Sequence, residues 1–203
     1  MFMFPKTTEM NRPLPKKAIF EKFSPSPTDR QRFDSEIRRL AIIHEISATT
    51  TNIAAGDGVS AFYVVLVSLR NMECDKKNIA MLSRLIDQKM LFVLEYEGNA
   101  SLAVCHSGKV IQSARRPVDS WEIKLSGLNL DAAWEYVIIQ IGGVRLSEGR
   151  KLDEQIAADI EREKILRQIE RLEKQARSEK QPRRKWELVE EVRRLKERLV
   201  TSF

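Results

Sequence analysis

The hydrophobic and polar positions of residues 151–203 repeat with the period of a coiled coil. Apolar residues recur at alternating spacings of three and four on both sides of a short break at 178–182, and this pattern forms the seam between two packed helices. Pro182 suits the first turn of a second helix. Because the connector is short, we expect residues 148–203 to form an antiparallel coiled-coil helical hairpin. The expected seam positions are Ile165, Ile169, Leu172 and Ala176 in the first helix and Leu188, Val192, Leu195 and Leu199 in the second.

The first part of the chain is rich in proline and predicts an extended N-terminal arm over residues 1–27. Proline fixes φ and disfavours helix in the residue before it. A helical turn is therefore expected only around Lys16–Phe23. The prolines that define the arm are Pro5, Pro13, Pro15, Pro25 and Pro27.

A first long helix is expected to begin at Thr28 or Asp29, since either side chain can cap a helix N-terminus. Its predicted buried face follows a helical period, and the threonines of 49–51 weaken the helix beyond that point. Residues 52–58 then form a turn. The positions on the predicted face are Phe33, Ile37, Leu40, Ala41 and His44.

The middle of the chain predicts an α+β domain over residues 28–147. One strand–helix–strand unit followed by successive hairpins indicates a mixed, mostly antiparallel sheet of about five strands with helices on one face. A helix capped by Asn129 and stopped by Gly142 and Gly143 closes the domain. The strands are expected at Ala61–Leu69, Met90–Glu97, Ser101–Cys105, Lys109–Ala114 and Ser120–Leu125, with a helix at Lys76–Lys89 between the first two.

Composition and charge narrow the class of protein. Hydrophobic residues make up 42% of the 203 and charged residues 32%, so the chain can bury one core and still carry a charge-rich appendage. The net charge of +6 is compatible with nucleic acid but is equally ordinary for a protein surface.

The cysteine content and the apolar runs indicate a cytoplasmic protein. Cys74 and Cys105 form no CxxC pair, and two thiols cannot build a disulfide scaffold. The N-terminus lacks the apolar core of a signal peptide. No apolar run approaches the ~20 residues needed to cross a bilayer. We therefore expect no membrane association.

Glu122 and Lys124 form the one pattern that points to catalysis. On a strand, residues at i and i+2 share a face, and an acidic residue with a lysine in this arrangement holds a divalent metal in restriction-type nucleases. Such a site needs a second carboxylate, for which Glu95, Glu97 or Asp119 are the candidates. The alternative is a cross-strand pair on a solvent-facing surface. The nuclease hypothesis therefore remains the second choice.

No other catalytic, metal or cofactor motif is present in the sequence. His44 and His106 are the two histidines, and neither has ligand-like neighbours at metal spacing. The turn at 52–58 is rich in glycine but is followed by no Gly-Lys-Ser/Thr, so it is neither a phosphate-binding loop nor a dinucleotide motif. We assign no catalytic residue, no metal and no cofactor.

Basic clusters are the candidate nucleic-acid contacts, because lysine and arginine neutralise phosphates without reading sequence. One cluster lies at the connector of the hairpin, a second ends a strand, and Lys16-Lys17 is a third; solvated surface charge is the alternative for each. Trp186 beside the connector is interpreted as a helix-packing residue, with a base-stacking platform as the alternative. The nucleic-acid candidates are Arg183, Arg184, Lys185, Arg115 and Arg116.

Several stretches resemble a bacterial family known only as domain of unknown function 4391. The opening residues 4–11, the segment 51–56, and the blocks 91–98 and 125–131 are similar to segments of that family, as are parts of the C-terminal hairpin. The likeness spans nearly the whole chain. At the position of Glu122 the family often carries an apolar residue, which weakens the nuclease hypothesis.

The resemblance implies a context rather than a reaction. Members of the family are often encoded beside helicase-like and DNA-methyltransferase proteins in bacterial defence islands. We therefore expect a non-enzymatic accessory subunit of a restriction or anti-phage system. Its partner is expected to be a helicase-like protein, an ATPase or a methyltransferase, with DNA or a second copy of the chain as further partners. The expected partner contacts are Leu188, Val192, Leu195 and Leu199.

Overall fold

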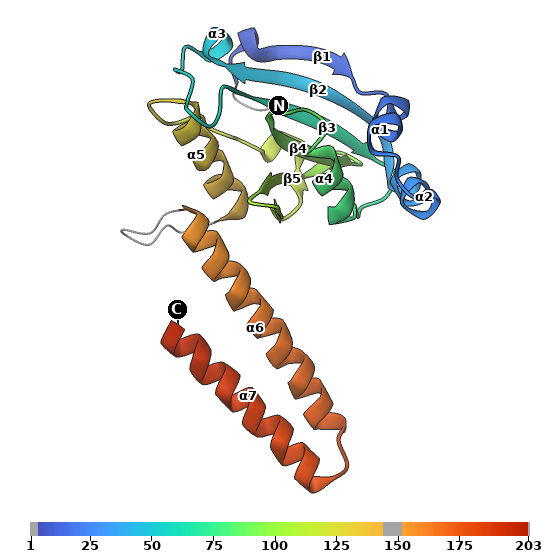
Figure 1. The fold of residues 1–203 in the computed structure, drawn as a ribbon, viewed down its shortest axis with the longest axis vertical. Coiled ribbons are helices and arrows are strands. Elements are labelled where there is room, and N and C mark those ends of the chain that lie inside the picture. The colour runs from blue at the N-terminus through green and yellow to red at the C-terminus, as the bar shows by residue number, and fades with distance from the viewer. Residues whose placement is uncertain (1–3, 144–151, 203) are drawn as a thin grey trace. The chain divides into compact units, whose positions relative to one another are not determined.

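The computed structural model describes residues 4–143 and 152–202 (Figure 1). The chain divides into two compact units, Met1–Arg145 and Leu146–Phe203. The first unit holds a sheet with its helices, and the second is a pair of helices.

The first unit is a mixed α+β structure built on an open seven-stranded sheet, with the main strand order β1-β2-β3-β4-β5-β6. Only β3 and β4 run parallel, and all other neighbours are antiparallel. The short strands β6 and β7 both pair with β5, at opposite ends of that strand. The strands are β1 Glu9–Pro13, β2 Ile37–Ser47, β3 Ala61–Leu69, β4 Lys89–Tyr96, β5 Asn99–His106, β6 Lys109–Gln112 and β7 Arg116–Pro117.

Helices cover both faces of the sheet, whereas the sequence predicted helices on one face only. Val65 of β3 belongs to a core cluster with Phe33 and Ile79, which lie on α2 and α4. Alternate residues of a strand point to opposite faces, and Phe62 of β3 packs on the other face against Trp134 of α5, with ring centroids 5.1 Å apart. The helices of this unit are α1 Lys16–Phe23, α2 Pro27–Glu36, α3 Ala48–Thr51, α4 Lys76–Leu82 and α5 Leu130–Gly142, with 3-10 turns η1 Lys6–Thr8 and η2 Val118–Ser120.

The N-terminal residues are part of the sheet unit and do not form a separate arm. Strand β1 pairs with β2 at the edge of the sheet. Phe4 and Ile19 are buried, and the helix predicted around Lys16–Phe23 is α1.

The prediction of one long helix through His44 is wrong beyond Glu36. Helix α2 is capped by Ser26, whose hydroxyl accepts the Asp29 amide at 3.2 Å, and Pro27 occupies its first turn. From Leu40 onward the burial alternates every second residue, which is the strand period of β2. Ile37, Leu40 and His44 fit a helical spacing as well, so a pattern based on those positions alone cannot separate the two structures.

The strand predicted at Ser120–Leu125 is also wrong. This segment begins in the 3-10 turn η2 and continues as irregular backbone. Trp121 and Ile123 are buried while Glu122 and Lys124 are exposed, so the alternation is real although no strand partner is present. Strands β6 and β7 already pair with β5 on that side, and the Trp121 indole instead donates to the Ala100 carbonyl at 2.9 Å.

The helix predicted at Lys76–Lys89 ends early, at Leu82. Beyond it the backbone continues in tight turns, with Arg84 donating to the Met81 carbonyl and Leu85 to the Leu82 carbonyl. Leu85 and Ile86 still pack against the core. The apolar spacing is therefore satisfied by turns that lead the chain into β4.

The second unit is a helical hairpin, as predicted. Helix α6 covers Leu152–Ser178 and α7 covers Pro182–Ser202, and the two run antiparallel (Figure 1). Its core contains Ile165, Ile169 and Leu172 of α6 with Val192 and Leu195 of α7. Burial of this seam excludes its side chains from water and supplies most of the stability of such a hairpin.

Candidate functional site: the loop end of the C-terminal hairpin

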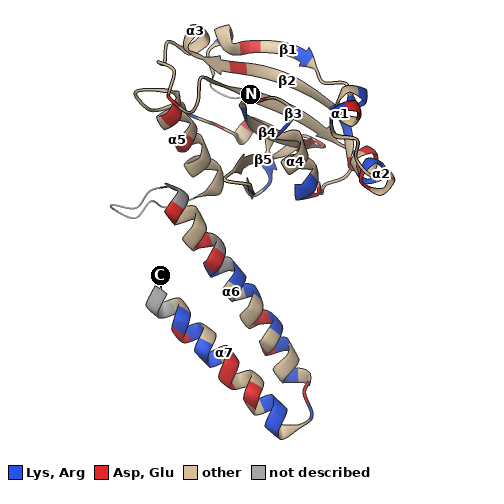
Figure 2. Ribbon diagram, in the orientation of Figure 1, with Lys and Arg blue, Asp and Glu red and all other residues tan. Residues whose placement is uncertain are grey.

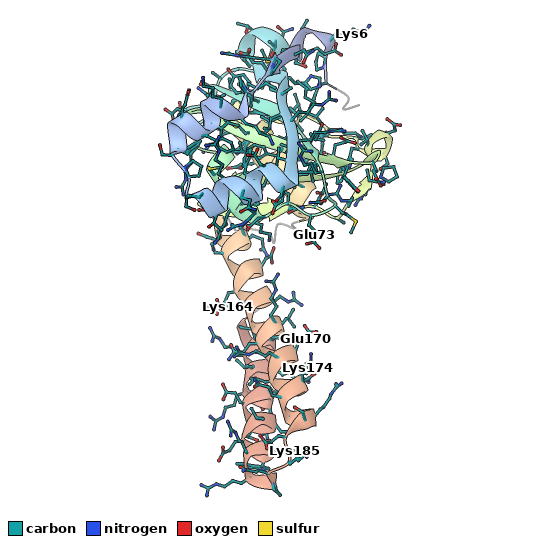
Figure 3. The ribbon with its side chains drawn as sticks, turned by 90° about the vertical axis from the view of Figure 1, so that its right-hand side faces the viewer. Lys6, Glu73, Lys164, Glu170, Lys174 and Lys185 are labelled. Carbon is teal, nitrogen blue, oxygen red and sulfur yellow. The ribbon has the colours of Figure 1, made fainter. Side chains whose placement is uncertain are left out.

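Positive charge of the helical hairpin is concentrated at its loop end. Residues 174–187, called the hairpin tip below, hold six Lys or Arg against two Glu, a net +4. Residues 151–203 as a whole hold 15 Lys or Arg against 12 Asp or Glu, a net +3, so the residues of this segment outside the hairpin tip carry a net −1. Figure 2 shows the basic start of α7, and Figure 3 labels Lys174 and Lys185 toward this end. All six cations are exposed: Lys174, Arg177, Lys180, Arg183, Arg184 and Lys185.

Both glutamates of the hairpin tip already have partners. Arg183 Nε lies 3.5 Å from a Glu187 oxygen, and Arg184 Nε lies 3.7 Å from a Glu179 oxygen. The other Glu179 oxygen accepts the Gln181 amide at 3.0 Å. This backbone bond is the main reason that the pKa of Glu179 lies below its usual value, although desolvation opposes it. Glu179 is therefore ionised and fixes the connector between the helices.

Trp186 is exposed and does not pack between the helices, contrary to the sequence interpretation. Its side chain is 66% exposed, and that of Val189 one turn later is 51% exposed. Trp186 precedes the seam residue Leu188 by two positions, and side chains two apart do not share a helix face. The hairpin tip therefore combines six exposed cations with one exposed indole.

The predicted partner contacts of α7 lie inside the hairpin. Val192 and Leu195 are buried in the seam, and Leu188 and Leu199 pack against the same cluster. Two ion pairs also join the helices, Lys196 to Glu173 at 2.8 Å and Arg198 to Glu161 at 3.1 Å. In this structure the seam side chains of α7 are thus occupied by α6 of the same chain.

In the second basic cluster, Arg115 and Arg116, the Arg115 side chain has a structural role. The Arg115 guanidinium donates to three carbonyls, those of Met72 at 2.6 Å, Leu94 at 3.2 Å and Asn99 at 3.3 Å. Burial lowers the pKa of Arg115, with the charge of Glu95 opposing. Arg115 therefore ties the strand ends together and has few donors left for a phosphate.

Arg116 is exposed and lies over the Trp121 ring, 5.0 Å from its centroid. In the N-terminal pair, Lys16 binds Asp34 at 2.8 Å and the Ile37 carbonyl, while Lys17 is 3.9 Å from Glu21. Within the sheet unit these three cations thus already contact an aromatic ring, a carboxylate or a carbonyl.

Glu122 and Lys124 are both exposed on the irregular segment that follows η2. The backbone of Lys124 is held by the Gln140 side chain, which donates to its carbonyl at 2.9 Å and accepts its amide at 3.1 Å. Glu95 accepts the Gly98 amide at 3.3 Å. Within residues 4–143 and 152–202 no group of three or more His, Cys, Asp or Glu side chains is placed to hold a metal ion.

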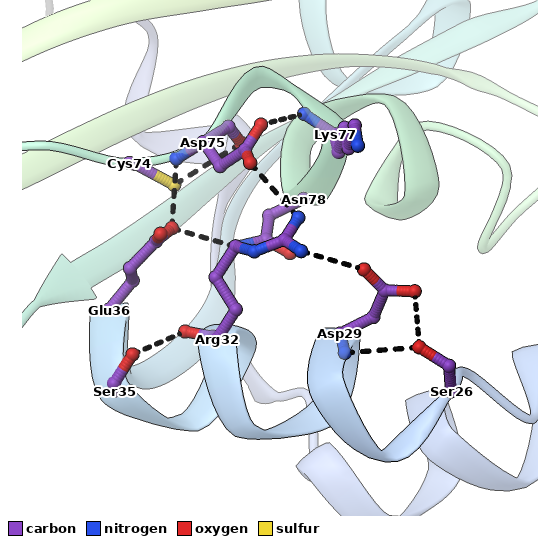
Figure 4. Close-up of polar contacts among 9 residues, drawn as sticks. All are labelled: Ser26, Asp29, Arg32, Ser35, Glu36, Cys74, Asp75, Lys77 and Asn78. Atoms are coloured by element: carbon purple, nitrogen blue, oxygen red, sulfur yellow. Dashed lines mark hydrogen bonds and ion pairs between the residues drawn. The ribbon is translucent and has the colours of Figure 1, made fainter.

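A polar network joins α2 to the start of α4 (Figure 4). One Glu36 oxygen accepts both the Asp75 amide and the Asn78 side-chain amide at 2.8 Å. Arg32 bridges Asp29 and Asp75 at 3.1 and 3.0 Å. The Cys74 thiol lies in the same network, where burial and then the charge of Glu36 raise its pKa to about 12. A thiol with such a pKa is a poor nucleophile, so the network is structural.

Two of the segments that resemble the family meet at the N-terminus of α5. The Leu130 amide donates to the Ala54 carbonyl at 2.8 Å. The Asp131 carboxylate accepts the amides of Asp57 at 2.8 Å and Gly58 at 3.2 Å. A Cβ on Gly56 would overlap that carboxylate, so glycine is required for this close approach. The sequence predicted a turn here but gave no sign of its partner on α5.

A polar hollow of about 420 Å³ in the sheet unit is lined by Lys22, Arg84, Asp87, Lys89 and Cys105 among others. The lining holds three cations, Lys22, Arg84 and Lys89, against the single carboxylate of Asp87, a net +2. Lys22 also donates to the Leu85 carbonyl at 2.6 Å, and we assign no ligand to this hollow.

Fold and site define an α+β protein with a seven-stranded sheet and a self-packed helical hairpin whose loop end is basic and carries an exposed tryptophan. The chain belongs to the family described as Domain of unknown function (DUF4391), whose model matches residues 2–199. No curated protein and no solved structure matches the chain. Among the helices of the described residues, none has the length and apolar character needed to cross a membrane.

Proposed function

We propose that the protein is a non-enzymatic accessory or adaptor subunit of a bacterial DNA-processing system of the restriction or anti-phage defence type. Its hairpin binds a partner protein, and its basic tip contacts nucleic acid. The partner we propose is the helicase-like protein, ATPase or methyltransferase that the family resemblance implies. The protein acts with that partner in the cytoplasm.

The observation that carries the proposal is the hairpin itself. It is a compact unit whose seam is filled by its own two helices. Apolar side chains that the seam does not use remain outside, Leu166 at 47% and Val189 at 51% exposure. A rigid helix pair with outward apolar residues suits docking into a hydrophobic groove of a partner. We therefore place the protein contact on this outer surface and not on the seam.

Co-purification from the native cell tests the proposal. A tagged chain should recover the partner in constant ratio after nuclease treatment, and Leu166→Glu with Val189→Glu should abolish that recovery. Charge on a docked apolar surface costs several kcal/mol, so a loss of at least tenfold is expected. Both residues are already exposed, so the far-UV circular dichroism of the double variant should match the wild type.

Leu195→Asp is the matched control, since it buries a charge in the seam and should unfold the hairpin as well as release the partner. Full recovery of the partner with the Leu166/Val189 double variant would rule out docking on the outer surface. Recovery that disappears with nuclease would show that nucleic acid, and not the hairpin, connects the two proteins.

A further inference from the structure

We propose that the hairpin tip, residues 174–187, is a binding site for single-stranded nucleic acid in which Trp186 stacks on an unpaired base. The inference rests on the part of the proposed function in which the basic tip contacts nucleic acid, and it names the class of nucleic acid and the residue that stacks on it. Its residues and its test are separate from those of the partner contact.

Trp186 is the most exposed tryptophan of the chain. Of the three tryptophans in the chain, Trp121 and Trp134 are 5% and 2% exposed, whereas Trp186 is 66% exposed. It lies in the first helical turn after Pro182, directly following Arg183, Arg184 and Lys185. An indole held on a helix end and open to solvent can accept a flat ring against its face.

The charge around this indole is strongly positive. Six cations and two glutamates lie within 174–187, and both glutamates are paired with arginines or with the connector backbone. Exposed ion pairs of this kind exchange readily with water and other anions. A polyanion can therefore recruit the arginines, and the three lysines have no acidic partner among the described contacts of the tip. A protein surface would need a matching acidic patch and a pocket for the indole at once.

An exposed indole beside cations suits a single strand better than a duplex. Bases in a duplex are stacked on one another, and an indole at a helix end reaches only their sugar–phosphate exterior. In a single strand every base offers a free aromatic face, and binding proteins combine a basic track with aromatic side chains that stack on successive bases. One indole flanked by cations fits one base and its neighbouring phosphates. The recognition is independent of sequence and admits both DNA and RNA.

Tryptophan fluorescence of the full chain tests the site directly, because Trp186 is the exposed indole of the three. Oligothymidylate and oligouridylate of twelve nucleotides are titrated at low salt, beside a duplex of equal length. Single strands should quench the exposed component, and the duplex should not. The relative quench by the two single strands decides whether DNA or RNA is preferred.

Variants measured by anisotropy of a labelled oligothymidylate separate stacking from charge. Trp186→Ala should weaken binding by about 5- to 150-fold, the range measured for one stacked base, while Trp186→Phe retains part of the affinity. Arg183→Glu with Arg184→Glu should weaken binding at low salt and flatten its salt dependence, because fewer counterions are released. Arg38→Glu, which reverses an exposed charge on β2 of the sheet unit, is the charge-reversal control and should bind like the wild type.

Equal affinity of Trp186→Ala and wild type would overturn the stacking site, as would equal quenching by single strand and duplex. Absence of binding by the wild-type chain would overturn the whole inference. Neither result touches the partner contact, which is read by co-purification with the Leu166 and Val189 variants. Conversely, if the variant with Leu166→Glu and Val189→Glu no longer recovers the partner but still binds oligonucleotide, that result supports the tip site.

Discussion

Gly56→Ala is expected to destabilise the sheet unit because the new methyl group displaces the Asp131 carboxylate. That carboxylate accepts the amides of Asp57 and Gly58 at 2.8 and 3.2 Å. Hydrogen bonds to a charged group contribute about 1.5–3 kcal/mol each, and we use the low end, about 3 kcal/mol for the pair, because the loop is exposed. Replacing glycine also restricts the unfolded chain, which returns about 0.4–1 kcal/mol.

The net loss is therefore about 2 kcal/mol, which corresponds to a decrease in Tm of about 4–8 °C for a unit of this size. Thermal unfolding followed by circular dichroism, with urea titration for the free energy, measures it. The backbone at Gly56 needs no left-handed φ, since the glycines with positive φ are at other positions of the described chain. The loss should thus arise from the steric conflict alone.

A double-mutant cycle with Asp131→Ala tests that reasoning. Without the carboxylate the three nearest atoms to the added methyl group are gone, so Gly56→Ala should then be neutral or slightly stabilising. The coupling between the two changes should be about 2–3 kcal/mol. A Gly56→Ala penalty of the same size in both backgrounds would refute the assignment of the conflict to Asp131.

Three further predictions concern buried and half-buried polar groups of the sheet unit. Glu36→Ala should lower the free energy of unfolding by about 2–4 kcal/mol in urea titrations, because the buried Asn78 amide loses its acceptor; a loss below about 1 kcal/mol would contradict this. Cys74 is tested in a Cys105→Ser background, where it is the remaining thiol. Because its pKa is raised to about 12, it should react with a disulfide reagent at pH 8 far more slowly in the native than in the unfolded protein. Equal rates in the two states would contradict this prediction. Burial lowers the pKa of His44 below 6.5, and the charge of Glu9 opposes this shift. The unfolded chain therefore binds the proton more readily, and the free energy of unfolding should fall as the pH drops below about 6.5. His44→Gln should remove this pH dependence of the unfolding midpoint, and an unchanged pH dependence in the variant would contradict the assignment to His44.

The strongly patterned elements could be predicted from the sequence because their local signals agree with their burial. Strand β3 has the predicted bounds Ala61–Leu69, since an apolar run buried on both faces admits few other structures. Helix α5 is capped by Asn129, which accepts the Ala132 amide at 3.0 Å, and its buried stripe lies where the periodicity placed it. The helical hairpin follows from the same agreement.

The errors arise where several structures share one pattern or where distant residues decide. Residues 37–47 carry apolar side chains at spacings that suit a helix and a strand, and pairing with β1 and β3 selects the strand. The Glu36 network depends on Asn78, and the Gly56 turn on Asp131; neither pairing has a local sequence signal. The exposure of Trp186, by contrast, could have been predicted from its position two residues before Leu188 in a helix.

Site-specific photocrosslinking in the native cell tests the central claim, that the outer surface of the hairpin docks a partner protein. A photoreactive phenylalanine analogue replaces Val189, and in a matched protein it replaces the exposed Glu97 of the β4–β5 turn. We expect position 189 alone to give one crosslinked product, identified by mass spectrometry as a helicase-like protein, an ATPase or a methyltransferase that also co-purifies in constant ratio. No product from position 189, or the same products from both positions, would contradict the proposed role of the hairpin.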